Sequence, residues 1–488
     1  MTCSRNTGLN IHNLPEVDQK KQWYALLIFF LFFTILYAFT GGLPFFWDRD
    51  VLQSRIARFL IDNDFYPLLP DTIDSGSFPA LAYLLAIFWK IFGRSLWIAH
   101  LIILLFTYGV VYQSWILLNH TLNKKHIIPG MLIVFANPVF LSQAVLFSPD
   151  MVMIFFVSMA VNAVIKNNRI LLTFALTGLM LSHSRGFTIA AALGIFELIR
   201  AGKGLNGRVF LKTVLPYLPG LLICSAWSFY HFAVKGWIFY HPGSPWAGCY
   251  EIVSIKDFIR NIFILIWRLL DNGMLFLWLI PLISLIYRWK NKSEPNEIIR
   301  FLNILLICIL VFTVPAMLIY KIMSSHRYLL TFFYFFSILF ACLLFHSPVF
   351  LKRQKLLFLF VLAGMVSGNF WIYPDRIAKG WDASLAHLPY HFLRREMISY
   401  LDRNQIPVET VGSEVPNLYP FDEIDAGNDK RSFPRANLSQ NTYIFYSNIF
   451  NGFTDREIDI LKSSWEIETE YHCLQVEVVL YRNPELIH

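Results

Sequence analysis

The chain has 488 residues, of which 56% are hydrophobic and only 15% are charged, and it contains 46 Phe. Because a soluble domain carries roughly 25% charged residues, this composition excludes a soluble globular protein and indicates a polytopic membrane protein. The net charge of +8 does not indicate nucleic-acid binding. Lys and Arg fall in small clusters between apolar runs, as they do in the cytoplasmic loops of membrane proteins.

The first apolar run covers residues 23–46 and contains almost no charges. A spanning helix needs ~20 apolar residues, which this run provides, as do residues 96–118 and 209–232. The first run is too long for a cleaved signal peptide, and residues 41–44 make a poor processing site. We therefore expect an uncleaved first span that follows a cytoplasmic N-terminus, residues 1–22.

An acidic pair, Asp48 and Asp50, opens the loop at residues 44–78 directly after the first span. A carboxylate at a membrane surface can take a proton from an attacking hydroxyl or amine, or hold a divalent cation that neutralises a leaving phosphate. The alternative is a solvated loop start whose acids pair with Arg49 or Arg55. The pair is a candidate catalytic site on an outer loop.

Residues 51–61 of the same loop predict a helix lying in the membrane interface. The apolar residues recur at helical spacing, opposite Arg55 and Arg58; they are Val51, Leu52, Ile56, Phe59 and Leu60.

Placing all basic clusters inside gives about eleven net crossings, with the N-terminus inside and the C-terminus outside. Residues 79–119 hold two apolar stretches but make one net crossing, so one stretch is expected to be re-entrant or broken. The hairpins around 151–199 are also short for full spans. Irregular or short helices at membrane depth indicate a cavity. The basic clusters that this topology places inside lie at residues 20–21, 124–125, 166–169, 200–208, 288–292 and 352–355.

Two segments within this scheme carry candidate site residues on the same outer side as the acidic pair. Asp150 opens the run at 151–165, and His183 with Arg185 interrupts the next apolar stretch. Ionisable residues inside a membrane are costly and usually face a cavity or a partner. Arg185 is a candidate phosphate ligand, because guanidinium groups bind phosphate in a bidentate manner. The alternative is an interfacial arginine whose charge reaches the headgroups.

Further candidates lie at the outer ends of later spans. Arg327 is a second candidate phosphate ligand, and Tyr328 beside it is either a site residue or an interfacial aromatic anchor. Trp246, in the outer loop 235–256, is a candidate for binding sugar or acceptor. Asp74 is either a solvated loop acid or a member of the same binding site.

The tail, residues 373–488, has more charge and no membrane-length apolar run. Residues 391–403 and 454–463 predict helices, while 443–447 and 474–481 predict strands. We expect a small extracytoplasmic α/β domain. Cys249 and Cys473 are both expected outside, where a disulfide between them can form; the sequence has no CxxC pattern that would indicate a zinc or redox site.

Several motifs together resemble the C-type membrane glycosyltransferases (GT-C), in particular the family 39-like branch of protein O-mannosyltransferases and aminoarabinose transferases. In chain order they are the pair Asp48 and Asp50, the segment 58–65, Phe78-Pro79 through residues 91–93, Asn137-Pro138 through Asp150, Arg185-Gly186-Phe187, residues 327–330, and the tail segment 380–383. The sequence departs from the family pattern in two places. Arg49 separates the acidic pair, and Ser77-Phe78 stand where many members have His or Lys before Pro79.

The resemblance implies an all-α polytopic membrane protein with a GT-C-like fold, in which residues 23–372 are the catalytic membrane domain. It implies an inverting hexosyl- or pentosyltransferase that uses a polyprenyl-phosphate sugar donor and a lipid, glycan or protein acceptor. Asp48, Asp50 and Asp150 would be catalytic, and a divalent metal, if present, would bind Asp50 and Asp150. The donor phosphate would be bound by Arg185, Arg327, Tyr328 and His183, and the sugar or acceptor by Trp246 and Asp74.

The same resemblance places the protein in a bacterial inner membrane, with the site and the tail facing the periplasm. The rival hypothesis is a transporter or flippase of a lipid-linked saccharide, which predicts internal repeats that the sequence lacks. A third hypothesis makes the tail a binding module and the membrane part its anchor, although about eleven crossings exceed what an anchor needs.

Overall fold

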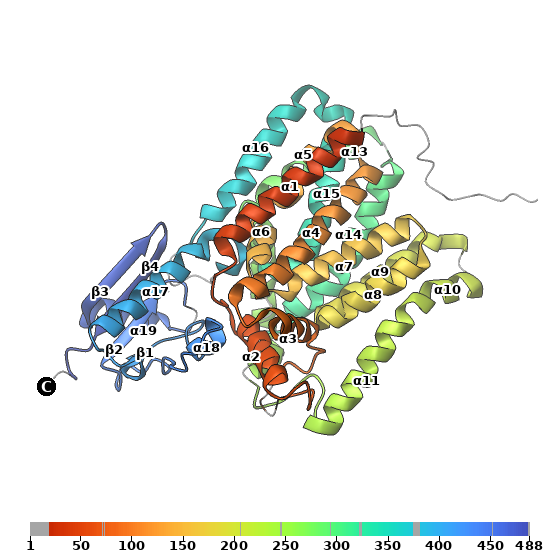
Figure 1. The fold of residues 1–488 in the computed structure, drawn as a ribbon. Helices are drawn as coiled ribbons and strands as arrows, with labels where there is room; N and C mark the ends of the chain where they lie inside the picture. The colour runs from red at the N-terminus through yellow and green to blue at the C-terminus, as the bar shows by residue number, and fades with distance from the viewer. Residues whose placement is uncertain are drawn as a thin grey trace, which may run out of the picture.

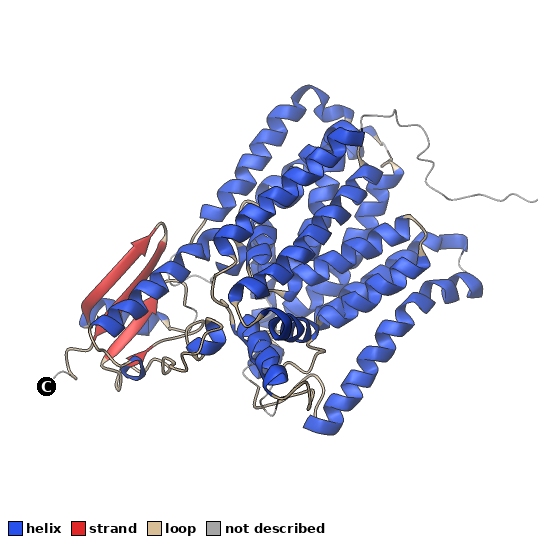
Figure 2. Cartoon of the chain, viewed as in Figure 1, coloured by secondary structure: helices blue, strands red, loops and turns tan. Residues whose placement is uncertain are grey.

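The computed structural model describes residues 19–70, 72, 74–204, 206–244, 246–292, 294–321, 325–373, 381–450 and 452–486. A bundle of helices is followed by a small C-terminal unit, residues 381–450 and 452–486, that contains the four strands (Figures 1 and 2). Most of the predicted cytoplasmic N-terminus lies outside the described residues, as do the side chains of Asp48 and Arg49 and the residue Gly380.

The bundle is built from fourteen helices of the described chain, and each helix either crosses the bundle or runs along its edge (Figure 1). Their bounds are α1 (Gln19–Thr40), α4 (Leu96–Thr121), α5 (Ile127–Phe135), α6 (Pro138–Val145), α7 (Pro149–Ile165), α8 (Arg169–Ser182), α9 (Ser184–Ala201), α10 (Gly207–Val214), α11 (Leu218–Lys235), α12 (Ile255–Leu270), α13 (Leu275–Asn291), α14 (Glu297–Ile319), α15 (Leu330–His346) and α16 (Gln354–Ser367).

Four helical stretches among the described residues are long and apolar enough to cross a membrane, or six if each of two bent pairs makes one span. The bent pairs are α5 with α6, at 69°, and α12 with α13, at 93°. Shorter apolar helices are α3, α7, α8 and the described part of α1, Leu26–Thr40, so the predicted first span is not among the four. Helices α7 and α8 match the short segments that the sequence predicted. The protein is thus a polytopic helical membrane protein, and the count of about eleven crossings stays a prediction.

Two of the sequence motifs form helix starts. The Asn137 side chain accepts hydrogen bonds from the backbone N–H groups of Val139 and Phe140, and Pro138 occupies the first turn of α6. Ser148 and Pro149 do the same for α7, where the Ser148 hydroxyl accepts from the Asp150 N–H. A polar cap followed by proline is a favoured helix N-terminus. These caps fix the chain direction just before Asp150.

The centre of the bundle is α15, a Phe-rich helix in which 94% of the apolar window is buried. A helix that is apolar all round belongs in the interior. By contrast, only 28% of the window spanning α10 and α11 is buried, and α11 lies along the edge of the bundle (Figure 1). Leu222, Phe229 and Phe232 of α11 face outward, as expected of a lipid-facing helix, while Cys224 and Trp227 are buried on its other side.

Two shorter helices, α2 (Asp48–Asp62) and α3 (Ala80–Phe92), pack against each other at the end of the bundle that carries the C-terminal unit (Figure 1). The predicted helix is confirmed, and Val51, Leu52, Ile56 and Leu60 are buried in protein. Its location in the membrane interface stays a prediction. Within the predicted single crossing at 79–119, α3 is a separate short helix and α4 is long enough to span.

The C-terminal unit places helices on a four-stranded sheet of order β1-β2-β4-β3. Strand β1 pairs parallel with β2, and the other two pairings are antiparallel. The predicted helices and two strands are confirmed, while β1 and β3 were missed. The elements are β1 (Val411–Gly412), β2 (Tyr443–Ser447), β3 (Glu466–Cys473), β4 (Val476–Arg482), α17 (Leu388–Arg403), α18 (Phe421–Ile424) and α19 (Asp455–Ser464).

The hydrophobic core of this unit includes residues of the bundle. Phe46 and Trp47, just before α2, and Leu146, just before α7, are buried in the same cluster as the sheet. Cys249 and Cys473 are free thiols, so the disulfide that the sequence allowed between them does not form.

Two histidines of the C-terminal unit lie against Phe46. The ring of His387 stacks on Phe46 with centroids 4.8 Å apart, and the ring of His391 lies 5.3 Å from it. Both histidines are fully buried, and neither ring nitrogen of His391 has a hydrogen-bond partner among the described residues. Burial lowers the pKa of His387 to about 4 and that of His391 well below its usual value, and for His391 the neighbouring His387 and Arg394 add to this.

Acidification is therefore expected to destabilise this interface. The folded state resists protonation of His387 and His391, whereas the unfolded chain accepts these protons near pH 6.5. The contribution of the two neutral histidines to the free energy of unfolding is therefore complete above that pH and is lost as the pH falls toward 4. For His387 the full loss is roughly 3 kcal/mol. Thermal unfolding of the detergent-solubilised protein between pH 7.5 and 4.5 measures it, and His391→Phe should flatten the profile.

Candidate functional site

Two of the candidate residues, Asp150 and Arg185, form an ion pair. Asp150 lies in the first turn of α7 and Arg185 in the first turn of α9, and Arg185 Nη2 is 2.6 Å from Asp150 Oδ1. The Asp150 side chain is fully buried, and its other oxygen accepts a hydrogen bond from Ser148 Oγ at 3.0 Å. A buried carboxylate needs such partners, because desolvation penalises an isolated charge. The ion pair thus holds both side chains at one end of the bundle.

The second pair of candidates lies beside the first. Arg185 Nη1 donates a hydrogen bond to the backbone oxygen of Arg327 at 3.3 Å. The guanidinium groups of Arg185 and Arg327 are 4.7 and 5.7 Å from the centroid of the same ring, that of Tyr328. Cations stack favourably on aromatic faces. Three residues that the sequence proposed separately, from α9 and from the 3-10 turn His326–Leu329, therefore form one cluster with Asp150.

Arg327 also contacts the C-terminal unit. Its Nε is 3.5 Å from Asp382 Oδ2, and Ser325 Oγ donates to the same carboxylate oxygen at 3.2 Å. The backbone oxygen of Asp382 accepts hydrogen bonds from Ser142 Oγ and Gln143 Nε2 of α6, both at 2.8 Å. The start of the C-terminal unit is thereby fixed between α6 and the arginine cluster.

His183 caps the helix that carries Arg185. Its Nδ1 accepts a hydrogen bond from the Arg185 N–H at 2.9 Å. Next to it, a Cβ atom built on Gly186 would lie 1.9 Å from the backbone oxygen of Leu179, so only glycine allows α9 to start this close to α8. Both residues fix the position of Arg185, and a phosphate-binding role of His183 stays a prediction.

The acidic pair lies at the start of α2. Asp50 is buried, with 1% of its surface exposed. Phe45, ahead of the pair, has its ring 5.4 Å from that of Phe147, which precedes Asp150 by three residues. The starts of α2 and α7 are therefore neighbours at the same end of the bundle.

Asp74 lies in a separate polar contact. Its Oδ1 is 3.0 Å from Nε2 of the buried His231 on α11 and accepts a hydrogen bond from the Gly76 N–H at 2.6 Å. His231 Nδ1 is 2.7 Å from the backbone oxygen of Trp237. These contacts tie the loop before α3 to the end of α11.

Trp246 is partly buried against the bundle core. Sugar or acceptor binding by Trp246 and Asp74 stays a prediction. Within the described ranges, no three His, Cys, Asp or Glu side chains group as a metal site, and metal binding by Asp50 and Asp150 likewise stays a prediction.

One buried network near the cluster was not predicted from the sequence. Asp271 lies at the sharp break between α12 and α13, and its Oδ2 is 2.7 Å from His326 Nε2 and 3.6 Å from Arg268 Nη1. The Tyr373 hydroxyl donates to Asp271 Oδ1. His326 directly precedes Arg327, so the network fixes the turn that presents the second arginine. In the sequence, Asp271-Asn272-Gly273 is a turn-forming stretch inside an apolar run, and this pattern indicates the break between the two helices.

The fold of this chain also occurs in solved structures. Two crystal structures of ArnT from Cupriavidus metallidurans are similar to it. The structure bound to undecaprenyl phosphate has a TM-score of 0.53 and 14% identity, covering 93% of this chain and 97% of that chain. The apo structure has a TM-score of 0.55 and 12% identity, covering 95% and 98%. No protein-family model and no curated protein matches the sequence.

Proposed function

We propose that this protein is a glycosyltransferase that moves a sugar from a polyprenyl-phosphate donor to a lipid, glycan or protein acceptor. The observation that carries the proposal is the pair of guanidinium groups on one aromatic ring, with Asp150 2.6 Å from Arg185. The fold shared with ArnT, one structure of which holds undecaprenyl phosphate, supports the same class of donor.

Arg185 and Arg327 would bind the donor phosphate together. Two neighbouring guanidinium groups offer parallel N–H donors, which suit a phosphate better than a single ammonium does. The 3.5 Å contact between Arg327 and Asp382 is longer than a tight ion pair, so Arg327 can exchange this carboxylate for a phosphate at small cost. As the phosphate leaves, the same two cations would stabilise its growing charge, and Tyr328 would keep them side by side.

The acidic pair would supply the base. In the proposed reaction, Asp48 or Asp50 takes the proton from the acceptor hydroxyl or amine, and the other acid orients the acceptor. The acceptor atom bonds to the anomeric carbon while the bond from that carbon to the phosphate oxygen breaks. Polyprenyl phosphate leaves, and a single displacement of this kind inverts the anomeric centre. The transferred sugar would be a hexose or a pentose.

The location of the cluster supports a site on one face of the membrane. The start of α2, the start of α7 and the C-terminal unit all lie at the same end of the bundle (Figure 1). We propose that this end is periplasmic in a bacterial inner membrane, with residues 1–22 in the cytoplasm, residues 23–372 as the catalytic domain and residues 373–488 outside.

The decisive test measures release of polyprenyl phosphate from a panel of polyprenyl-phosphate sugars by the purified full-length protein with membrane acceptors. The three test variants, made singly, are Asp48→Asn, Asp50→Asn and Arg327→Ala. Loss of the base, whichever of the two acids it is, and loss of the phosphate ligand Arg327 should each lower the rate of release by about 100-fold or more. The control is Asp257→Asn, at a partly exposed ion pair on α12. Wild-type rates in all three variants would contradict the proposal.

A lipid-linked saccharide flippase is the alternative. In proteoliposomes it would move the labelled lipid between leaflets without releasing polyprenyl phosphate. The enzyme releases polyprenyl phosphate in detergent, where no leaflets exist, so this comparison separates the two.

A further inference from the structure

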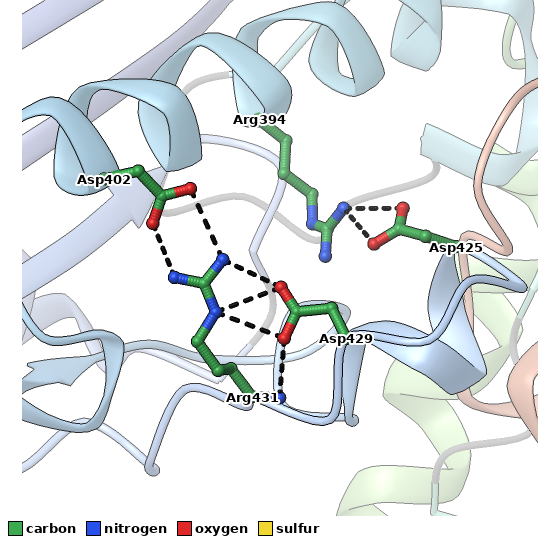
Figure 3. Close-up of polar contacts among 5 residues, drawn as sticks. All are labelled: Arg394, Asp402, Asp425, Asp429 and Arg431. Carbon is green, nitrogen blue, oxygen red and sulfur yellow. Dashed lines mark hydrogen bonds and ion pairs between the residues drawn. The ribbon is translucent and has the colours of Figure 1, made fainter.

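A loop of the C-terminal unit, here named the acidic finger and comprising residues 421–431, is held rigidly at its base. The Phe421 N–H donates to the backbone oxygen of Arg431 at 2.9 Å, which closes the loop. The Arg431 guanidinium pairs with Asp429 at 2.8 Å and with Asp402 of α17 at 2.5 Å (Figure 3). These ion pairs raise the pKa of Arg431 and lower that of Asp429, as expected when each charge stabilises the other.

A second arginine holds the middle of the finger. Arg394 of α17 is 2% exposed, and its Nη1 donates to both oxygens of Asp425 at 2.9 and 3.1 Å (Figure 3). Its Nε donates to Asn417 Oδ1 at 2.8 Å. The Phe421 ring lies 5.0 Å from the Arg394 guanidinium. These contacts hold the loop in one conformation, so α18 at its start has a defined position.

The first part of the finger, α18, contacts the helix that carries the acidic pair. Arg55 donates through Nε and Nη2 to the Glu423 carboxylate, at 2.8 to 3.1 Å. Arg58 pairs with Asp422, and this pairing raises the pKa of Arg58. Arg55 and Arg58 lie near the middle of α2. The Glu423 and Asp422 side chains are only 15% and 4% exposed, so solvent screens these pairs less than it screens pairs on an open surface.

Two backbone contacts complete the connection. The Phe45 N–H, just before α2, donates to the backbone oxygen of Ile424 at 2.9 Å. Arg94, just after α3, donates to the backbone oxygen of Asp422. The finger therefore contacts the entry to α2, its middle, and the helix packed against it.

We propose that the acidic finger is a positioning device that sets the rotation and height of α2, with Asp422 and Glu423 as its positioning residues. Asp48 and Asp50 lie in the first turn of α2, so a small rotation of this helix about its axis would move both acids together. A displacement of about 1 Å in a reacting group can cost 100-fold in rate. The catalytic part of the inference rests on the proposed function, whereas the clamping of α2 does not.

Charge reversal tests the device with two independent readouts on the full-length protein. Arg55→Glu and Glu423→Arg, made singly, should speed hydrogen exchange of the α2 amides at least 10-fold. They should also lower kcat about 10- to 100-fold with little change in the KM for the lipid donor. The combined Arg55→Glu/Glu423→Arg variant restores opposite charges and should return both readouts to within about threefold of wild type. If a single reversal fails to fold, Arg55→Gln and Glu423→Gln replace it, with the same expected directions.

The control pair is Arg482 with Glu466 on the sheet, an exposed ion pair of similar length in the same unit. Reversing Arg482 should leave both readouts unchanged. Unchanged α2 exchange in the single reversals would overturn the inference whether or not the protein transfers sugar. Faster α2 exchange with no transfer by the wild type would keep the clamp and reject the proposed function. Faster exchange with an unchanged kcat would reject the positioning role.

Discussion

Replacing Arg185 by alanine is expected to lower sugar transfer by at least about 100-fold and to destabilise the protein by about 3–5 kcal/mol. The variant removes the 2.6 Å partner of Asp150, whose side chain is fully buried, and leaves that charge without its counter-ion. It also removes one of the two cations on the Tyr328 ring. Transfer kinetics and thermal inactivation of the detergent-solubilised protein measure the two effects separately.

Arg185→Lys separates charge from geometry at the same position. Lysine keeps a cation for Asp150 but lacks the forked donors, so stability should largely recover while transfer stays low. The control is Arg300→Ala, at an exposed ion pair with Glu294, which should change neither quantity. Wild-type transfer by Arg185→Ala would remove Arg185 from the site.

Replacing Asp271 by alanine is expected to be the most destabilising change outside the arginine cluster. Asp271 is the shared partner of His326, Arg268 and the Tyr373 hydroxyl, and Arg268 is only 3% exposed. Removing one partner of a buried ionic network typically costs about 3–5 kcal/mol, because the remaining charge is left desolvated. The half-life of the folded protein at a fixed elevated temperature measures this loss.

The matched control for Asp271 lies near the opposite end of α12. Asp257→Ala removes a partly exposed pair with Arg260, at 3.0 Å, and exposed pairs contribute about 0–1 kcal/mol. A half-life for Asp271→Ala equal to that of the control would show that the network is not an anchor. A moderate recovery is expected with Asp271→Asn, since an amide oxygen still accepts the Tyr373 hydroxyl.

Local patterns in the sequence predicted most of the elements that bury one face. The helical spacing of apolar residues in α2 and the alternation of Val476, Val478 and Leu480 in β4 were read correctly, because both segments bury the predicted side. Strand β3 was missed although Ile467, Thr469, Tyr471 and Cys473 alternate with charged residues and His472. It is a sheet edge in which no side chain is fully buried, and its apolar content is low. Strand β1 has only two residues, too few for any pattern.

The candidate site was predicted in its residue types but not in its contacts. The sequence placed Asp150 and Arg185 on the same side of the membrane, yet their direct pairing depends on how α7 and α9 pack. Asp382 and Asp271 were missed as partners because single acids in loops or helix breaks have no periodic signal. Asp382 contacts Arg327, and Asp271 contacts His326, only because the folded chain brings the C-terminal unit and the α12–α13 break beside the turn that contains both residues.

The docking of the acidic finger has a consequence for biosynthesis. Arg55 and Glu423 are 368 residues apart in the chain. At ~5–20 residues per second, a ribosome needs roughly 20–70 s to supply the second after the first. Throughout that interval Phe46 and Trp47 have no C-terminal core to enter, so we expect the loop that contains them to depend on a chaperone until translation ends.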